Sequence, residues 1–316
     1  MNNHDTHVMN VVDRSFQGDP GCTDSLLLPE SQPNGFSPSY PVFAGDASSK
    51  LCLPGQPSVS SDGCPLLHVD LFGGFNVTRE ITPVDRTFLG RTKVQTLMSI
   101  LVLSGDRDVN ATAICHSMWP EAGADKANRS LYSLWGLLRN ALVLSDKRCP
   151  YLERRNSSCR LVGKYVISDV QLADDLCNRL QFGCSSADEA TLVARQLQSL
   201  YRGDLLPGEE SNALILRKRW EWRSRVVESL AGCSRRLYKE GEVHHAIWLS
   251  RFATSVDPTR EDACVDLMKC YLAVGAKAAA IQAYNELRHY LMVELAVTPS
   301  SYVVEFFNEV IADDEE

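Results

Sequence analysis

Hydrophobic and polar residues begin to alternate near residue 66, and further along the chain they recur at helical spacing. Apolar and polar side chains alternate from Leu67 to Leu71, and the pattern resumes at Phe75–Val77 after two glycines. A period of two that is interrupted by glycine predicts a β-hairpin. Thr87–Leu89 is expected to add a third strand before Gly90. A small sheet is therefore predicted to open the folded part of the chain.

Three helices are predicted after this sheet. The first runs from about Arg91 to Ser104, and the second is a short helix that Asn110 caps and Trp119-Pro120 closes. The third runs from about Asp125 to Leu142. Each has one apolar stripe at spacings of three and four residues. The stripes are Val94, Leu97, Met98, Leu101 and Val102; Ala111, Ile114, Cys115 and Met118; and Leu131, Trp135, Leu138 and Leu142.

A second hairpin is predicted after the third helix. Tyr151–Arg155 and Cys159–Val162 flank Asn156–Ser158, which has the composition of a turn. Strands, three helices with a short second one, and a terminal basic hairpin are the elements of a winged helix-turn-helix domain. In such a domain the third helix lies in the major groove of DNA. The basic hairpin would be the wing and would bind neighbouring phosphates.

The second half of the chain is helical by pattern and contains a repeat. Gly241 and Gly275 are 34 residues apart, which is the period of tetratricopeptide units. Small and apolar residues keep the same register, as Ala246 does with Ala280. Asp257-Pro258 and Thr298-Pro299 are expected to open new helices, with proline at the first helical position. The predicted fold is therefore mainly α with small β: a winged helix followed by an all-α, tetratricopeptide-like domain.

Composition and charge divide the chain into three parts. Residues 1–65 hold eight of the fourteen prolines and no apolar periodicity, which predicts a disordered leader. Residues 66–168 form the predicted winged helix, and residues 169–316 the predicted helical-repeat domain. The net charges are −5, +5 and −8 respectively, so only the winged helix is basic. A local positive surface is what phosphate binding requires, whatever the net charge of −8 for the whole chain.

Residues 66–312 resemble the bacterial transcriptional activator domain family, the regulators of the antibiotic-regulatory-protein type. In the first half the resemblance lies in Leu97–Leu101, Trp119–Glu121 and Leu138–Leu142. In the second half the motifs are Tyr201–Pro207, Asp257-Pro258 with Glu261, Leu267-Met268, Gly275, Ala280, Tyr284, Leu291 with Glu294-Leu295, and Pro299-Ser300. The resemblance implies a transcription activator that binds promoter repeats in double-stranded DNA as a homodimer, contacts RNA polymerase, and acts in the cytoplasm at the nucleoid.

The candidate DNA-binding residues lie on the third helix and in the wing. Arginine can bind guanine through two hydrogen bonds, and tyrosine or serine can reach a base edge or phosphate. Arginines of the wing would bind backbone phosphates. On the helix the candidates are Lys126, Asn128, Arg129, Tyr132, Ser133 and Arg139; in the wing they are Arg154, Arg155 and Arg160.

Other classes of function have little support. The chain has no phosphate-binding loop, nucleophile elbow or His-Glu-x-x-His motif, so an enzyme is not expected. The eleven cysteines include no Cys-x-x-Cys pair, and His244-His245, placed in the turn after Gly241, has no third ligand at a metal spacing. Larger relatives carry an ATPase domain after the helical domain; this sequence ends at Glu316, so ATP control is not expected. Neither a cofactor nor a membrane segment is predicted, and the five tryptophans are expected in the core.

A second function stays open. Gly136 and Leu137 stand in the third helix where the family usually has a basic and a polar residue, and Ser158-Cys159 and Ala173-Asp174 also depart from the family pattern. The helical-repeat domain is acidic. These features are compatible with a protein-interaction adaptor whose winged helix no longer binds DNA.

Overall fold

The computed structural model describes residues 59–80, 82–84, 86–155 and 157–312. The predicted leader lies outside the described residues up to residue 58. Its last part, residues 59–65, forms a turn on the domain that follows. The Asp62 carboxylate accepts hydrogen bonds from Lys164 Nζ at 3.1 Å and from the Tyr165 hydroxyl at 2.6 Å. The Tyr151 hydroxyl donates to the Pro65 carbonyl oxygen at 2.9 Å.

The first sheet has four strands in the order β3-β2-β1-β7. β1 (Leu67–Asp70) and β2 (Asn76–Arg79) form the predicted antiparallel hairpin. β7 (Val166–Ser168) lies parallel to β1 on its other side and leads directly into helix α5 (Asp169–Phe182). The chain therefore passes from this sheet into the helical half without intervening residues.

The expected third strand at Thr87–Leu89 is wrong. Arg86–Leu89 is the one-turn helix α1, and the third strand is β3 (Thr82–Pro83). Helix α1 contacts the later helix α4, and Leu89 is buried. Three residues are too few to show a period, so the prediction rested on β-branched and aromatic composition alone, and that composition yields to tertiary packing.

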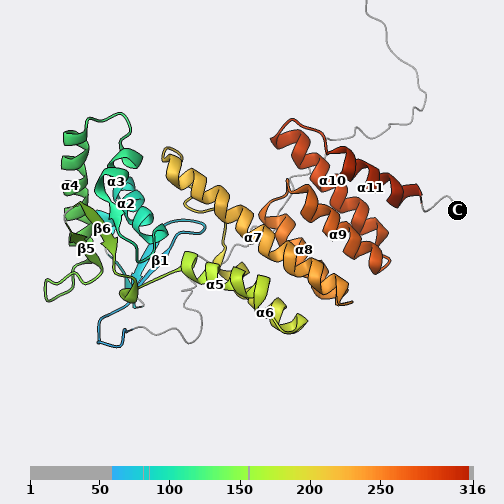
Figure 1. The fold of residues 1–316 in the computed structure, drawn as a ribbon, viewed down its shortest axis with the longest axis horizontal. Coiled ribbons are helices and arrows are strands. Elements are labelled where there is room, and N and C mark those ends of the chain that lie inside the picture. The colour runs from blue at the N-terminus through green and yellow to red at the C-terminus, as the bar shows by residue number, and fades with distance from the viewer. Residues whose placement is uncertain (1–58, 81, 85, 156, 313–316) are drawn as a thin grey trace, which may run out of the picture. The chain divides into compact units, whose positions relative to one another are not determined.

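The three predicted helices are present as α2 (Thr92–Leu103), α3 (Ala111–Met118) and α4 (Ala124–Leu142). All three predicted apolar stripes are buried. The Asn110 side chain caps α3 by accepting a hydrogen bond from the Thr112 backbone N–H at 2.8 Å. The three helices pack on one another, and α4 also contacts α1 (Figure 1).

The predicted wing is a hairpin in a second sheet of order β4-β6-β5. β5 (Leu152–Arg155) pairs antiparallel with β6 (Ser158–Leu161), and β4 (Val109–Asn110) adds the third strand. A short 3₁₀ helix, η1 (Gly163–Tyr165), then leads into β7. With the wing in place, the first half of the described chain has the elements of a winged helix.

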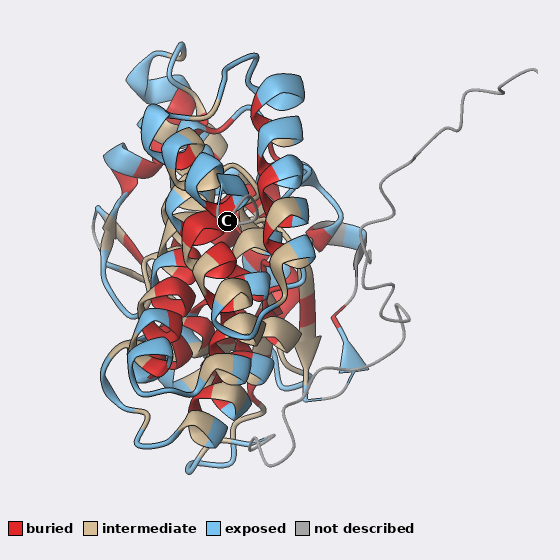
Figure 2. Ribbon diagram, turned by 90° about the vertical axis from the view of Figure 1, so that its right-hand side faces the viewer, coloured by how far each residue is buried: buried red, intermediate tan, exposed pale blue. Residues whose placement is uncertain are grey.

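The second half is helical, as predicted, and contains the repeat. Gly241 follows α7 and Gly275 follows α9, and their φ angles of +85° and +72° are the left-handed values that favour glycine after a helix. Ala246 and Ala280, one repeat apart, are both fully buried. Buried residues line the contacts between neighbouring helices (Figure 2). The helices after α5 are α6 (Ala187–Leu200), α7 (Ala213–Lys239), α8 (Val243–Val256), α9 (Glu261–Ala273), α10 (Lys277–Glu294) and α11 (Ser301–Ala312).

Some details of this half differ from the predictions. Pro258 and Pro299 lie before their helices rather than at the first helical position. After α8, Asp257 Oδ1 accepts hydrogen bonds from the Thr259 backbone N–H and hydroxyl, and this turn delays the start of α9. His244 and His245 lie in the first turn of α8, not in the turn before it. Among the described residues, no helix is long and apolar enough to cross a membrane.

One tryptophan is not in the core. Trp220 on α7 is 68% exposed, whereas Trp135 is buried and Trp222 packs partly buried against the core. Helical spacing alone placed Trp220 among apolar residues, but it lies on the opposite face of α7 from the buried Ile215 and Val226.

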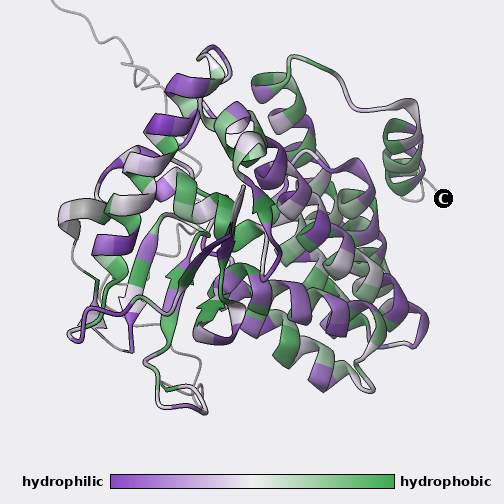
Figure 3. Ribbon diagram, turned by 60° about the vertical axis from the view of Figure 1, so that its left-hand side comes forward, coloured by the Kyte–Doolittle hydropathy of each residue, from purple (hydrophilic) through white to green (hydrophobic). Residues whose placement is uncertain are grey.

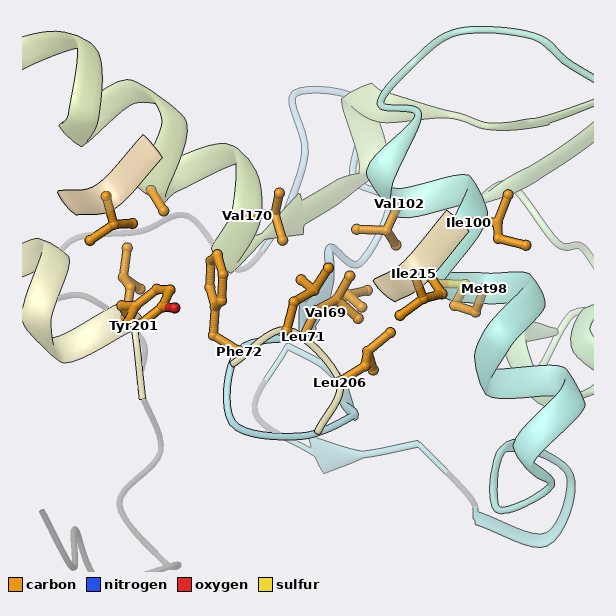
Figure 4. Packing of buried hydrophobic residues seen from close by; sticks show 14 of the residues in the cluster. Val69, Leu71, Phe72, Met98, Ile100, Val102, Val170, Tyr201, Leu206 and Ile215 are labelled. Atoms are coloured by element: carbon orange, nitrogen blue, oxygen red, sulfur yellow. The ribbon is translucent and has the colours of Figure 1, made fainter. Parts of the chain in front are cut away.

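One hydrophobic core connects the winged helix with the helical half (Figure 4). Val69, Leu71 and Phe72 come from the first sheet and the residues after it, and Leu206 and Ile215 come from the chain before and within α7. The Phe72 ring centroid lies 4.9 Å from that of Tyr201 and 5.5 Å from that of Trp222. Figure 3 colours hydrophobic residues green, and green segments of both halves meet in the middle of the molecule. Helix α11, beside the C-terminal label, is also largely green.

Polar contacts extend the same junction. The buried Glu209 carboxylate accepts a hydrogen bond from the Thr96 hydroxyl of α2 at 2.6 Å. Asn212 caps α7 through its side-chain oxygen, and its Nδ2 donates to the Ser117 carbonyl oxygen of α3 at 3.0 Å. Residues 201–212 thus pack against α2, α3 and the first sheet. Helices α2 and α3 pack against α4 and also form hydrogen bonds with Glu209 and Asn212 of the helical half.

Candidate nucleic-acid interface

Helix α4 presents most of the predicted reading residues to solvent. Lys126, Arg129, Tyr132 and Ser133 are exposed, while Leu131 and Trp135 on the opposite side are buried. This division follows from the helical period of 3.6 residues, which separates the buried stripe from the polar face. Four of the predicted residues therefore share one exposed face, in the N-terminal half of α4.

Asn128 differs from its neighbours because it faces α3. It is half-buried, and its Oδ1 lies 3.6 Å from the Cys115 Sγ, which can donate a weak hydrogen bond. The side-chain amide keeps its Nδ2 group for other contacts. Asn128 thus joins α4 to α3 and lies at the edge of the exposed face.

Arg139 is separated from the other reading residues. It is exposed on α4, but ten residues after Arg129 at a rise of 1.5 Å per residue it lies about 15 Å further along the helix axis. There it lines a cavity of about 500 Å³ together with Lys147, Arg148 and Cys149. The structure therefore does not bring Arg139 together with Arg129 and Tyr132.

The position of α4 depends on an arginine that the sequence analysis did not single out. Arg79, at the end of β2, donates a hydrogen bond from Nη2 to the Leu142 carbonyl oxygen, the last residue of α4, at 2.9 Å. Its guanidinium carbon also lies 5.7 Å from the centroid of the Tyr151 ring, just before the wing. A cation that satisfies the free carbonyl groups at the end of a helix also interacts favourably with its dipole. No local pattern marks Arg79, because its partners are distant in the sequence.

Arg154 connects the wing to α4. Its guanidinium carbon lies 3.8 Å from the centroid of the Tyr132 ring, and the two elements lie side by side in Figure 1. Arginine stacked on an aromatic face keeps its N–H groups in the plane of the guanidinium, where they remain able to donate. Two residues predicted separately, one on the helix and one in the wing, thus form a single surface.

Arg155 and Arg160 lie on the other face of the wing and share one carboxylate. Arg155 donates from Nε and Nη2 to Glu153 Oε1 at 2.9 and 2.6 Å, and Arg160 Nη2 donates to Glu153 Oε2. Arg160 Nε lies 3.8 Å from Asp108 Oδ1. The hydrogen bonds from Arg155 and then Arg160 lower the pKa of Glu153 below its usual value, so the carboxylate stays ionised. Two of the three wing arginines are therefore ion-paired.

Glu153 escaped the sequence analysis although a signal was available. Arg155 pairs with Ser158 across the hairpin, and this register sets Glu153 directly opposite Arg160. Because side chains alternate between the faces of a strand, Glu153 and Arg155 share one face and Arg154 lies on the other. A two-residue turn at residues 156 and 157 would have predicted the same neighbours.

The part of the chain that the structure describes offers no metal site beside this surface. Among the described residues, no group of three or more histidine, cysteine or acidic side chains could hold a metal ion. His245 lies near Thr191, whose hydroxyl oxygen is 2.9 Å from Nδ1, and its Nε2 is 3.8 Å from Asp188. The geometry is that of a hydrogen-bonded surface histidine.

Comparison with known families identifies the helical half. Residues 179–311 match the family model described as "Bacterial transcriptional activator domain". The match begins within α5 and ends within α11, so it covers most of the helical half. The predicted family resemblance is thereby confirmed, and the matched family is one of transcriptional activators.

A solved structure has a similar fold. The chain is similar to Mycobacterium tuberculosis EmbR in complex with a low affinity phosphopeptide, with a TM-score of 0.58 and 19% sequence identity. The similarity covers 78% of this chain and 65% of the EmbR chain, so the chain spans just under two thirds of that relative. It confirms the predicted fold class, a winged helix followed by a helical domain. No curated protein matches the chain.

Proposed function

We propose that this protein is a sequence-specific DNA-binding regulator of transcription. In this proposal α4 lies in the major groove, where Arg129, Tyr132 and Ser133 contact base edges. Lys126 and Asn128 contact DNA near the start of the helix. Arg139 would contact the flank of the site, since it lies about three turns further along α4.

The contact between Tyr132 and Arg154 carries this proposal. It joins the exposed face of α4 to the wing at 3.8 Å, which supports a continuous surface for a duplex. Arg154, Arg155 and Arg160 would bind the phosphates beside the groove. The net charge of +5 on residues 66–168 supports the same assignment, because the rest of the chain is acidic.

The activator domain supports a more specific role. We infer that the protein activates transcription in the cytoplasm, at the nucleoid, by binding promoter repeats as a homodimer and contacting RNA polymerase through the helical half. Residues 66–168 would be the DNA-binding unit and residues 169–316 the regulatory unit. The family description supports activation, and the junction around Phe72 supports a fixed relation between the two units.

The test is binding of the purified chain to DNA fragments from its own upstream region at two salt concentrations. We expect the wild type to retain one fragment at physiological salt, whereas the Arg129→Ala, Tyr132→Ala double variant loses it. The matched control is Arg251→Ala, Tyr302→Ala, which removes an exposed arginine and an exposed tyrosine from the helical half. If the wild type discriminates among no fragments, or if the control loses binding equally, the proposal is wrong.

An adaptor that binds proteins is the second candidate. A groove of about 1030 Å³ lies between α2, α5 and α7, with Val102, Val170 and Trp222 among its lining residues. The exposed Trp220 and Leu216 lie one turn apart on α7, and aromatic residues of this kind are enriched at protein interfaces. Salt-dependent, fragment-specific DNA affinity distinguishes the regulator from the adaptor, which would bind DNA only weakly and without preference.

A further inference from the structure

The three wing arginines are in two different environments. Arg154 stacks on Tyr132, and no ion pair joins it to any carboxylate of the described chain. Arg155 and Arg160 both donate to Glu153 on the opposite face of the hairpin. The difference comes from strand alternation, so the hairpin register fixes it.

We propose that Glu153 limits the sequence-independent affinity of the wing for DNA by occupying Arg155 and Arg160, and leaves Arg154 as the arginine that is ready to bind. This inference rests on the proposed function. It assigns Glu153 a role in DNA selectivity, although its carboxylate would contact no base.

The physical argument begins with what phosphate binding depends on. The affinity of a protein for any duplex rises with the number of phosphates that its cations neutralise, and this part of the affinity carries no sequence information. Glu153 reduces it in two ways. Its negative charge lies within a Debye length of any phosphate that the wing approaches, and its two oxygens hold the donor groups of two arginines.

Because these ion pairs are weak, Glu153 reduces phosphate binding by Arg155 and Arg160 but does not prevent it. Exposed ion pairs are weak because water and salt screen them, so a phosphate held close by a well-docked α4 can replace the carboxylate. A duplex that fits α4 poorly holds its phosphates less closely and gains less from the same exchange. Glu153 should therefore weaken non-specific binding more than specific binding.

The experiment measures DNA affinity against salt for the full chain and for Glu153→Gln. Poly(dA-dT) duplex is the non-specific probe, and the fragment retained from the upstream region is the specific one. Between about 50 and 200 mM salt, we expect the plot of log affinity against log salt for poly(dA-dT) to steepen by about 0.9 per arginine released, up to about 1.8. Affinity for poly(dA-dT) should rise about fivefold or more at the lower salt concentration, and the ratio of specific to non-specific affinity should fall.

The matched control is Glu221→Gln on α7. Glu221 also pairs with two cations, Arg217 at 3.5 Å and Lys218 at 2.6 Å, but lies outside the winged helix. Glu221→Gln changes the net charge by the same amount as Glu153→Gln, and it should leave the salt dependence of DNA affinity unchanged. In the triple variant Glu153→Gln, Arg155→Ala, Arg160→Ala, the plot of log affinity against log salt should be no steeper than that of the wild type.

The outcomes separate the two proposals. If the wild type binds its fragment but Glu153→Gln leaves the slope unchanged, or Glu221→Gln steepens it equally, the inference about Glu153 is overturned and the proposed function stands. If none of the proteins binds either DNA, the proposed function fails and the inference fails with it.

Discussion

The exposed surface of α4 and the wing is built differently from the junction between the winged helix and the activator domain. On the surface, Tyr132, Arg154 and Glu153 contact other solvent-exposed or half-buried side chains, and each contact contributes little to stability. At the junction, Phe72 is almost fully buried and Glu209 has hydrogen-bond partners for both oxygens. Substitutions on the surface should therefore change binding without unfolding the protein, whereas those at the junction should change stability first.

Phe72→Ala is expected to have the largest effect on stability. The ring packs between Tyr201 and Trp222, and its removal leaves a cavity that connects both halves. Truncation of a buried phenylalanine to alanine typically lowers the free energy of unfolding by about 3–5 kcal/mol. Unfolding in denaturant measures the loss, and Phe182→Ala is the control because Phe182 is 83% exposed. Equal losses in the two variants would contradict the comparison between junction and surface.

Asp169→Asn should change how stability depends on pH. Asp169 begins α5, and its buried Oδ2 accepts hydrogen bonds from the Leu71 and Phe72 backbone N–H groups, both at 2.8 Å. Burial raises the pKa of this carboxyl to about 7, against the effect of these two donors. The folded protein thus holds a proton that the unfolded chain releases near pH 4, so stability falls as pH rises from about 4 to about 7 and then levels off.

The asparagine variant has no such proton, and its side-chain oxygen can still accept both hydrogen bonds. Its stability relative to wild type should therefore increase over the same pH range, by about 4 kcal/mol for a pKa difference of about three units. Free energies of unfolding at about pH 4 and about pH 8 measure this difference. Parallel pH profiles for the two proteins would show that Asp169 ionises normally in the fold.

Gly136→Ala should have the smallest effect, and a favourable one. A Cβ at Gly136 would meet no atom within 4 Å, and the residue lies inside α4. Alanine in place of an interior helical glycine stabilises by about 0.5–1 kcal/mol. Gly241→Ala is the contrasting control, because its φ of +85° disfavours any side chain. A loss of stability in Gly136→Ala would mean that α4 needs this glycine.

The same comparison explains how much of the protein the sequence predicts. Local patterns predict α2, α3, α4 and the wing hairpin, because each depends on spacing within a few residues. They do not predict that α2 also buries Thr96 and Ile100, on sides away from its predicted stripe, because the chain that covers Thr96 comes from Glu209, more than a hundred residues later.

The candidate site shows the same limit. The exposed face of α4 follows from the helical period, so Arg129 and Tyr132 could be named in advance. The stacking of Arg154 on Tyr132 and the capping of α4 by Arg79 depend on how separate elements pack. The pairing of Glu153 with Arg160 follows from the observed register, in which Arg155 lies opposite Ser158; the predicted turn, Asn156–Ser158, would instead set Glu153 opposite Leu161.

The segment from Tyr201 to Asn212 has a consequence for how such proteins could be recombined. It belongs to the helical half in the chain, but its contacts with Leu71, Thr96 and Ser117 complete the surface of the winged helix. A winged helix grafted onto a foreign regulatory domain would leave these groups uncovered unless the new domain supplied an equivalent segment. A functional chimera therefore has to keep the contacts between residues 201–212 and the winged helix, in addition to each folded half.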